Sequence, residues 1–179
     1  MNKKTGWTAA AAAVILAGGL GVWSLAGKEG PAELSKQEIK QMVSGYSART
    51  LQADSASISS HQLTVVSQDR KESVIDLPKD EFFVSIAPYI EQTHPCAIHS
   101  LTGCQGELGN QPFEVTVTDE EGQTVVEDTM QSYDNGFIDL WLPRNGTYEL
   151  TIQHEGKSST AKITTNEGDN TCVTTMQLT

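Results

Sequence analysis

The alternation of apolar and polar side chains in the C-terminal half is the feature that most restricts the fold. Phe113, Val115 and Val117 alternate with polar residues, and the same alternation recurs further along the chain. A period of two is typical of antiparallel strands with one buried face. The expected strands are 113–118, 138–142, 148–152, 161–164 and 172–178, with turns at 119–122 and 145–146. Short strands with close turns predict an immunoglobulin-like antiparallel β-sandwich.

A different pattern precedes the sandwich. Ser35 and Glu38 have the spacing of a capping box, so a helix is expected to begin at about Lys36. The serine-rich segment 54–60 is expected to be a loop. Three β-prone segments follow, at 63–66, 74–77 and 82–86, and the first two are expected to form a hairpin. The predicted fold class is therefore α+β, a small N-terminal α+β module followed by the sandwich.

The expected helix carries one apolar stripe, formed by Ile39, Met42, Val43 and Tyr46. One helix and a few strands give a thin hydrophobic core for a module of this size. We therefore expect the stripe to be covered by a further surface, either from the second module or from another copy of the chain. This reasoning predicts a homodimer formed through the N-terminal module.

The first residues have the layout of a signal peptide. M-N-K-K-T is basic, and no charged residue occurs from Gly6 to Gly27. Cleavage is expected near Ala26, so the protein is predicted to be exported to the periplasm. An alternative is retention, because about 20 uncharged residues can also cross a bilayer. The predicted organisation is a signal peptide at 1–26, the α+β module at 27–93, and a Cys/His loop with the sandwich at 94–179.

The formal net charge of the whole chain is −11 at pH 7. A chain this acidic is a poor partner for nucleic acid or anionic lipid, so no nucleic acid is expected among its partners. Attraction of cations and simple solubility explain the charge equally well. Charge therefore excludes classes of function without choosing one.

Potential metal ligands are concentrated between the two modules. His94, Cys96, His99 and Cys104 lie in a short segment rich in glycine, and Cys172 follows on the last expected strand. Thiolate sulphur is a soft ligand that prefers Cu(I), and imidazole binds copper and zinc alike. The cluster therefore predicts a copper site, with zinc as the alternative. The two histidines are equally well explained as structural residues, and Met176 as packing.

The cysteines also have a purely structural explanation. There are three of them, so one disulfide and one remaining thiol are expected in an oxidising compartment. A Cys104–Cys172 bridge would stabilise the fold by roughly 4 kcal/mol, and a Cys96–Cys104 bridge by roughly 2 to 3 kcal/mol. Spacing alone does not choose between a disulfide and a metal site.

A family resemblance adds to these observations. The segment T-H-P-C-A-I-H-S-L-T-G-C-Q-G-E-L, together with a C-terminal cysteine, resembles the CueP family of periplasmic copper-resistance proteins. The resemblance implies a two-domain protein that binds copper through Cys96, Cys104 and Cys172. It also implies a role in copper tolerance and copper supply to periplasmic enzymes such as Cu,Zn superoxide dismutase.

The chemistry of such a site follows from thiol redox reactions. Two thiolates that form a disulfide release two electrons, which can convert Cu(II) to Cu(I). A periplasmic thiol reductant of the disulfide-isomerase type must then regenerate the thiols, so we expect a metal-binding protein that is not a turnover enzyme. The rival functions are a thiol-disulfide oxidoreductase, which lacks support because no C-x-x-C occurs, and a protein-interaction module with a structural disulfide.

Overall fold

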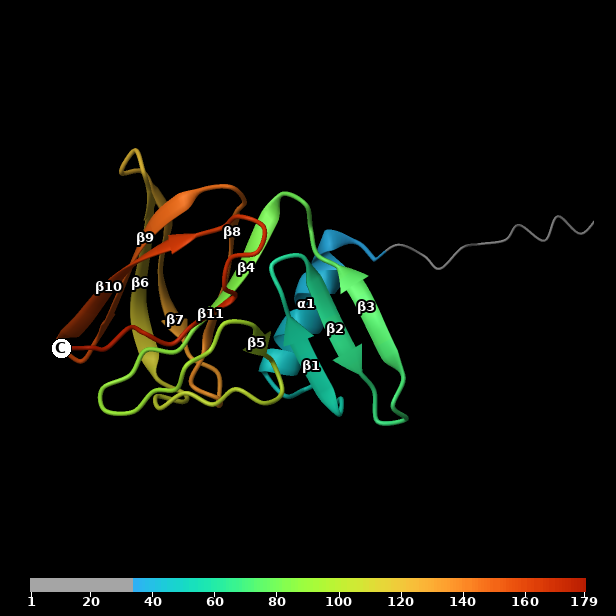
Figure 1. Cartoon of the computed structure of the whole chain (residues 1–179). Helices are drawn as coiled ribbons and strands as arrows, with labels where there is room; N and C mark the ends of the chain where they lie inside the picture. The colour runs from blue at the N-terminus through green and yellow to red at the C-terminus, as the bar shows by residue number, and fades with distance from the viewer. Residues whose placement is uncertain (1–33) are drawn as a thin grey trace, which may run out of the picture. The chain divides into compact units, whose positions relative to one another are not determined.

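Three β-sheets and one helix make up the computed structural model, which describes residues 34–179 (Figure 1). The predicted signal peptide lies outside the described residues. The helix is α1 (Lys36–Ser47), and the first sheet has the order β3-β2-β1-β5. Its strands are β1 (Ser55–Ile58), β2 (Gln62–Val66), β3 (Glu72–Asp76) and β5 (His99–Ser100). Among the residues described, no helix is long and apolar enough to span a membrane.

The other two sheets form the predicted sandwich. The second sheet has the order β10-β9-β6-β7 and the third has the order β11-β4-β8. Their strands are β4 (Glu81–Ile86), β6 (Pro112–Asp119), β7 (Thr124–Gln131), β8 (Ile138–Pro143), β9 (Thr147–His154), β10 (Lys157–Thr164) and β11 (Cys172–Val173). Phe113, Val115 and Val117 of β6 are buried, while Glu114 is exposed. The alternation thus forms the expected antiparallel sandwich, and the α+β class is confirmed.

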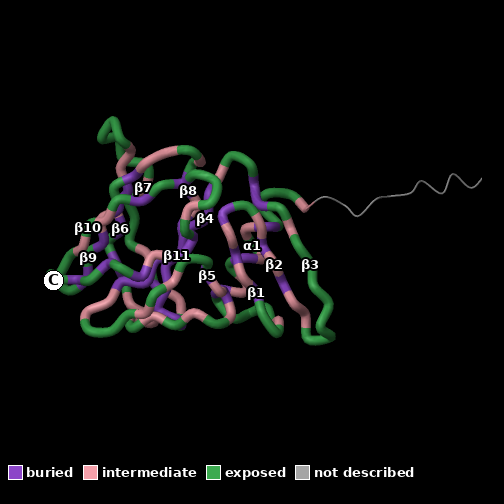
Figure 2. Tube along the Cα trace, in the orientation of Figure 1, coloured by how far each residue is buried: buried purple, intermediate pink, exposed green. Residues whose placement is uncertain are grey.

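Strand β4 contributes to two hydrophobic cores, and Figure 2 shows the burial along it. Phe82, Val84 and Ile86 face the core between the second and third sheets. Phe83 points to the opposite face, into a core shared with α1 and the first sheet. By their contacts, residues 34–179 form one unit, and the division at residue 93 stays a prediction.

Helix α1 begins as the sequence predicts. The amide of Glu38 donates to Ser35 Oγ at 3.3 Å, and the amide of Ser35 donates to Glu38 Oε2 at 2.8 Å, which completes the capping box. Ile39 and Val43 are 6% and 1% exposed because they pack against the first sheet and β4. The chain itself therefore covers the stripe. The homodimer stays a prediction, and the reason given for it no longer applies.

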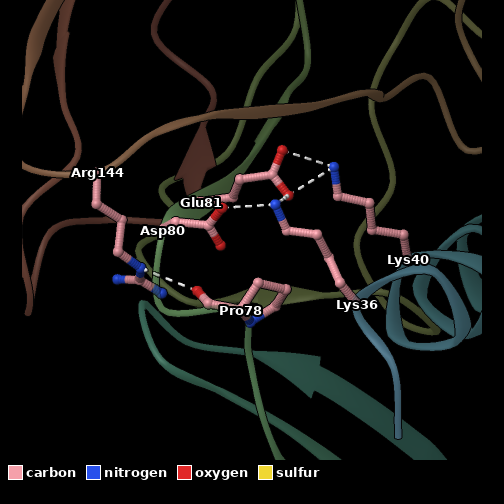
Figure 3. A network of polar contacts seen from close by, with 6 residues as sticks. All are labelled: Lys36, Lys40, Pro78, Asp80, Glu81 and Arg144. Atoms are coloured by element: carbon pink, nitrogen blue, oxygen red, sulfur yellow. Dashed lines mark hydrogen bonds and ion pairs between the residues drawn. The ribbon is translucent and has the colours of Figure 1, made fainter.

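A network of ion pairs joins the start of α1 to the start of β4 (Figure 3). Lys36 Nζ lies 2.6 Å from Asp80 and 3.1 Å from Glu81, and Lys40 Nζ lies 2.7 Å from Glu81. Lys40 also lies over the ring of Trp141, 5.2 Å from its centroid. Such partly exposed pairs contribute little stability individually. They connect α1 to the residues at the start of β4.

Several strands differ from the expectations, β1, β7 and β11 most clearly. The serine-rich segment forms β1, because Ala56 and Ile58 alternate with serines that tolerate the outer face of a sheet. Strand β7 was not expected, because its apolar residues Val125, Val126 and Met130 do not alternate regularly with polar ones. Its largely exposed edge position allows this pattern. Strand β11 is only Cys172–Val173 and runs parallel to β4, so the expected strand 172–178 is shorter than predicted.

A buried carboxyl group lies between α1 and the third sheet. Asp139 on β8 accepts hydrogen bonds from Ser47 Oγ at 2.5 Å and from Ser85 Oγ at 2.6 Å. Burial raises the pKa of Asp139 to about 6, and the two hydroxyl donors oppose that shift. The folded state therefore favours the protonated carboxyl.

This shift predicts a pH dependence of stability. Because the folded pKa of Asp139 exceeds its unfolded value, the contribution of Asp139 to the free energy of unfolding should fall as pH rises from about 4 to about 6. Asp139→Asn stays neutral, so its stability relative to wild type should increase by about 1 to 3 kcal/mol across that range. Urea unfolding at several pH values measures this difference, with exposed Asp128→Asn as the control. A difference between Asp139→Asn and wild type that is constant with pH would contradict the assignment.

Candidate metal centre

Two long connections and two short strands bring the candidate ligands together (Figure 1). Cys96 lies in the connection from β4 to β5, His99 lies on β5, and Cys104 lies in the connection from β5 to β6. Strand β11 delivers Cys172 by pairing in parallel with β4, where Cys172 lies opposite Ser85. The topology thus joins positions that are distant in sequence.

Backbone hydrogen bonds fix this arrangement. The amides of Thr171 and Cys172 donate to the carbonyl of Ala97 at 3.0 and 3.2 Å. The amide of His99 donates to Thr171 Oγ1 at 3.1 Å, and that hydroxyl donates to the carbonyl of Ile58 at 2.6 Å. Hydrogen bonds to Thr171 and Cys172 therefore hold the Cys96 segment and the first sheet, including β5, next to the start of β11.

The ligand atoms of Cys96, His99, Cys104 and Cys172 all lie within 4.8 Å of one another. Cys96 and Cys172 form a disulfide, and Cys104 is the free thiol. Cys104 Sγ lies 3.6 Å from Cys96 Sγ, and Cys172 Sγ lies 3.6 Å from His99 Nδ1. The two disulfides considered from the sequence, Cys104–Cys172 and Cys96–Cys104, are not formed, because Cys96 is bonded to Cys172.

His99 is fully buried and its environment keeps it neutral. Burial lowers the pKa of His99 to about 4, and the charge of His94 contributes a smaller part of the shift. Its ring packs against Phe137 with centroids 4.5 Å apart. His99 Nε2 is buried without a hydrogen-bond partner. A neutral imidazole offers a lone pair at periplasmic pH, which suits a ligand role.

His94 and Met176 lie elsewhere. His94 is half-buried, outside the four-residue group, and it lines a surface pocket with Gln105 and Glu107. Met176 is buried in the sandwich core, among the apolar residues between the second and third sheets. His94 and His99 could not be distinguished from the sequence, because they differ in burial.

Close packing of two glycines shapes the loop that carries Cys104. A Cβ atom on Gly106 would lie 3.0 Å from the carbonyl oxygen of Gly136, and Gly136 has a φ of +78°. The amide of Gly106 donates to the carbonyl of Asn135 at 2.7 Å. Larger residues would separate the Cys104 loop from the turn that carries Phe137. The glycine content of this segment indicates a loop but not this packing.

The site differs in exposure from one side to the other. Cys172 and His99 are 2% and 0% exposed, whereas Cys96 and Cys104 are partly exposed. Solvent therefore reaches the group from the side of Cys96 and Cys104. With the disulfide reduced, three sulphurs and one buried imidazole would be available, a donor set that fits a soft metal such as Cu(I).

The fold and the site together define a thiol-rich, metal-binding β-sandwich protein. The family described as periplasmic copper-binding protein CueP matches residues 18–177, and the chain belongs to this family. A crystal structure described as that of S.CueP is 41% identical in sequence, with a TM-score of 0.74. That match covers 79% of this chain and 88% of the other. No curated protein sequence matches the chain. The predicted family resemblance is confirmed.

Proposed function

We propose that the protein binds Cu(I) in the periplasm through the thiolates of Cys96, Cys104 and Cys172, with His99 as a fourth ligand. The observation that carries this proposal is the convergence of these four ligand atoms within 4.8 Å. Membership of a family of periplasmic copper-binding proteins supports the choice of copper over zinc. Thiolate ligands also favour Cu(I) over harder cations.

We further propose that the thiols reduce Cu(II). The thiolates of Cys96 and Cys172 would give up two electrons and form their disulfide, while two Cu(II) ions become two Cu(I) ions. The disulfide seen between these residues supports this pairing as the oxidised state. Each protein molecule performs the reaction once until a periplasmic dithiol reductant of the disulfide-isomerase type restores the thiols. The protein is therefore proposed to act stoichiometrically and not as a turnover enzyme.

Once the reductant has restored the thiols, the partly enclosed thiolate site can hold Cu(I), and this retention would provide copper tolerance. The bound ion could then pass to a periplasmic cuproenzyme such as Cu,Zn superoxide dismutase. Partial exposure of Cys96 and Cys104 supports transfer, because an acceptor ligand can reach these sulphurs directly. The rival thiol-disulfide oxidoreductase would use the same sulphurs without metal.

Elemental analysis of protein purified from the periplasm under anaerobic conditions tests the proposed function. The expected result is close to one copper ion per chain. Protein that carries no metal would support the oxidoreductase or the protein-interaction module, and protein that carries zinc alone would support the zinc alternative.

The two histidines should differ in their effect on copper. His99 lies in the four-residue group and His94 does not. We expect His99→Asn to weaken Cu(I) binding at least tenfold, because loss even of a group that only supports a ligand weakens metal binding about 10-fold or more. His94→Asn should change Cu(I) binding less than about threefold. Anaerobic competition with a Cu(I) chelator measures both affinities. Equal losses in the two variants would argue against the assigned ligand.

A further inference from the structure

One carboxylate beside the metal centre gathers an unusual set of donors. Glu107 Oε2 accepts hydrogen bonds from the backbone amides of Ile90, Glu91 and Gln92, at 2.8, 2.9 and 3.0 Å. Three successive amides that point at one charged oxygen form a strong interaction, since hydrogen bonds to an ionised acceptor are roughly twice as strong as neutral ones. These donors also lower the pKa of Glu107, so the carboxylate stays charged.

This contact joins the two segments that carry Cys96 and Cys104. The three amides precede Cys96 by only a few residues, and Glu107 follows Cys104 closely. The backbone beside Glu107 is itself fixed, because the amide of Gly106 donates to the carbonyl of Asn135 at 2.7 Å. Glu107 therefore connects the Cys104 loop, which is held in place at Gly106, to the Cys96 loop, which has no regular secondary structure from 91 to 98.

Few other contacts hold that second loop. Thr93 Oγ1 donates to the carbonyl of Thr174, and the carbonyl of Ala97 accepts from the amides of Thr171 and Cys172. Gln177 Nε2 also donates to the carbonyl of Ile90 at 3.0 Å, and the disulfide from Cys96 to Cys172 is the covalent tie. Reduction breaks this covalent bond. The reduced protein is also the state in which the thiolates are free to bind metal. The hydrogen bonds to Glu107 then carry a larger share of the positioning.

We propose that Glu107 is a positioning residue that holds Cys96 opposite Cys104 and Cys172 when the disulfide is open. It thereby raises two quantities together, the Cu(I) affinity of the reduced protein and the tendency of Cys96 and Cys172 to form their disulfide. The first of these rests on the proposed function, whereas the second does not involve copper. Both depend on how often the Cys96 sulphur occupies its place in the site.

Glu107→Ala tests the proposal through both quantities. Cu(I) affinity of the reduced protein is measured by anaerobic competition with a chelator. The disulfide equilibrium is measured against glutathione in a Cys104→Ser background, which leaves one pair of thiols. In that reaction oxidised glutathione takes two electrons from the Cys96 and Cys172 thiolates, giving the protein disulfide and two molecules of reduced glutathione.

We expect Glu107→Ala to lower both constants roughly tenfold, as loss of groups that orient metal ligands does. For the disulfide, tenfold corresponds to a rise of about 30 mV in reduction potential. Glu107→Gln keeps an oxygen acceptor without its charge and should give an intermediate loss. The matched control is Asp119→Ala, which removes a carboxylate that accepts backbone amides of Glu121 and Gln123 in the distant β6–β7 turn. It should leave both constants unchanged.

The two readouts separate the outcomes. A weaker disulfide with unchanged Cu(I) affinity would support the positioning role and refute the copper–thiolate site. Unchanged disulfide equilibrium would overturn the positioning role, whatever happens to copper binding. Thermal melts of the oxidised proteins check folding, where Glu107→Ala should stay close to the control because the disulfide still holds the loop. If Glu107→Ala does not fold, Glu107→Gln decides the question by the same two measurements.

Discussion

Reduction of the Cys96–Cys172 disulfide is expected to lower the free energy of unfolding by about 4.5 kcal/mol. The bond spans a sequence separation of 76 residues, and closing a loop of that length removes much conformational entropy from the unfolded chain. Cys96→Ser should produce a loss of similar size under oxidising conditions in a Cys104→Ser background, where no other pair of cysteines can form a disulfide. Cys104→Ser should change stability by less than about 1 kcal/mol, because Cys104 is the free thiol.

Denaturant unfolding of the oxidised and the reduced wild type measures the first loss directly. The same experiment on Cys104→Ser gives the matched comparison, since it replaces one partly exposed sulphur by oxygen at the same site. Equal stability of oxidised and reduced wild type would mean that the bond adds nothing to the folded state. A large loss in Cys104→Ser would instead point to a different resting pair.

The fold could be predicted where local pattern and burial agree. The alternation of Phe113, Val115 and Val117 gave the sandwich, and the capping box of Ser35 and Glu38 gave the helix start. Both signals depend on neighbours within a few positions. Composition misled where it replaced pattern, as in the serine-rich β1 and the exposed edge strand β7.

The metal centre could be predicted in its residues but not in its geometry. The types and density of ligands singled out the three cysteines, His94 and His99, and the structure groups all of them except His94. Their convergence depends on the parallel pairing of β11 with β4, and no local sequence pattern predicts this pairing. The resting disulfide likewise depends on this pairing, so loop length alone suggested other partners for Cys172. Glu107 had no signal in sequence, because its partners are backbone amides.

Loss of the Cys104 or the Cys172 thiolate is expected to produce the largest change in copper binding. Cys104→Ser and Cys172→Ser should each weaken Cu(I) binding of the reduced protein more than about 100-fold. The reason is that a hydroxyl is a hard ligand that does not replace a thiolate, and even supporting groups contribute about 10- to 100-fold. Cys96→Ser should weaken binding in the same way if Cys96 is a ligand. As a residue that only forms the disulfide, it would mainly slow the reduction of Cu(II).

The pattern across stability and affinity distinguishes the two cysteines. Cys172→Ser should lower the free energy of unfolding measured under oxidising conditions, and it should also weaken Cu(I) binding measured after reduction. Cys104→Ser should weaken Cu(I) binding alone. Met176→Leu is the control, since its sulphur lies in the sandwich core. It should leave Cu(I) affinity unchanged and cost less than about 1.5 kcal/mol.

Anaerobic titration of reduced wild type, Cys104→Ser and Cys172→Ser against a Cu(I) chelator is the measurement that tests the central claim most directly. The copper–thiolate site predicts a loss of more than about 100-fold in both variants, with the folded state retained in thermal melts. Wild-type affinity in both variants would contradict it, and the three cysteines would then serve only to stabilise the fold.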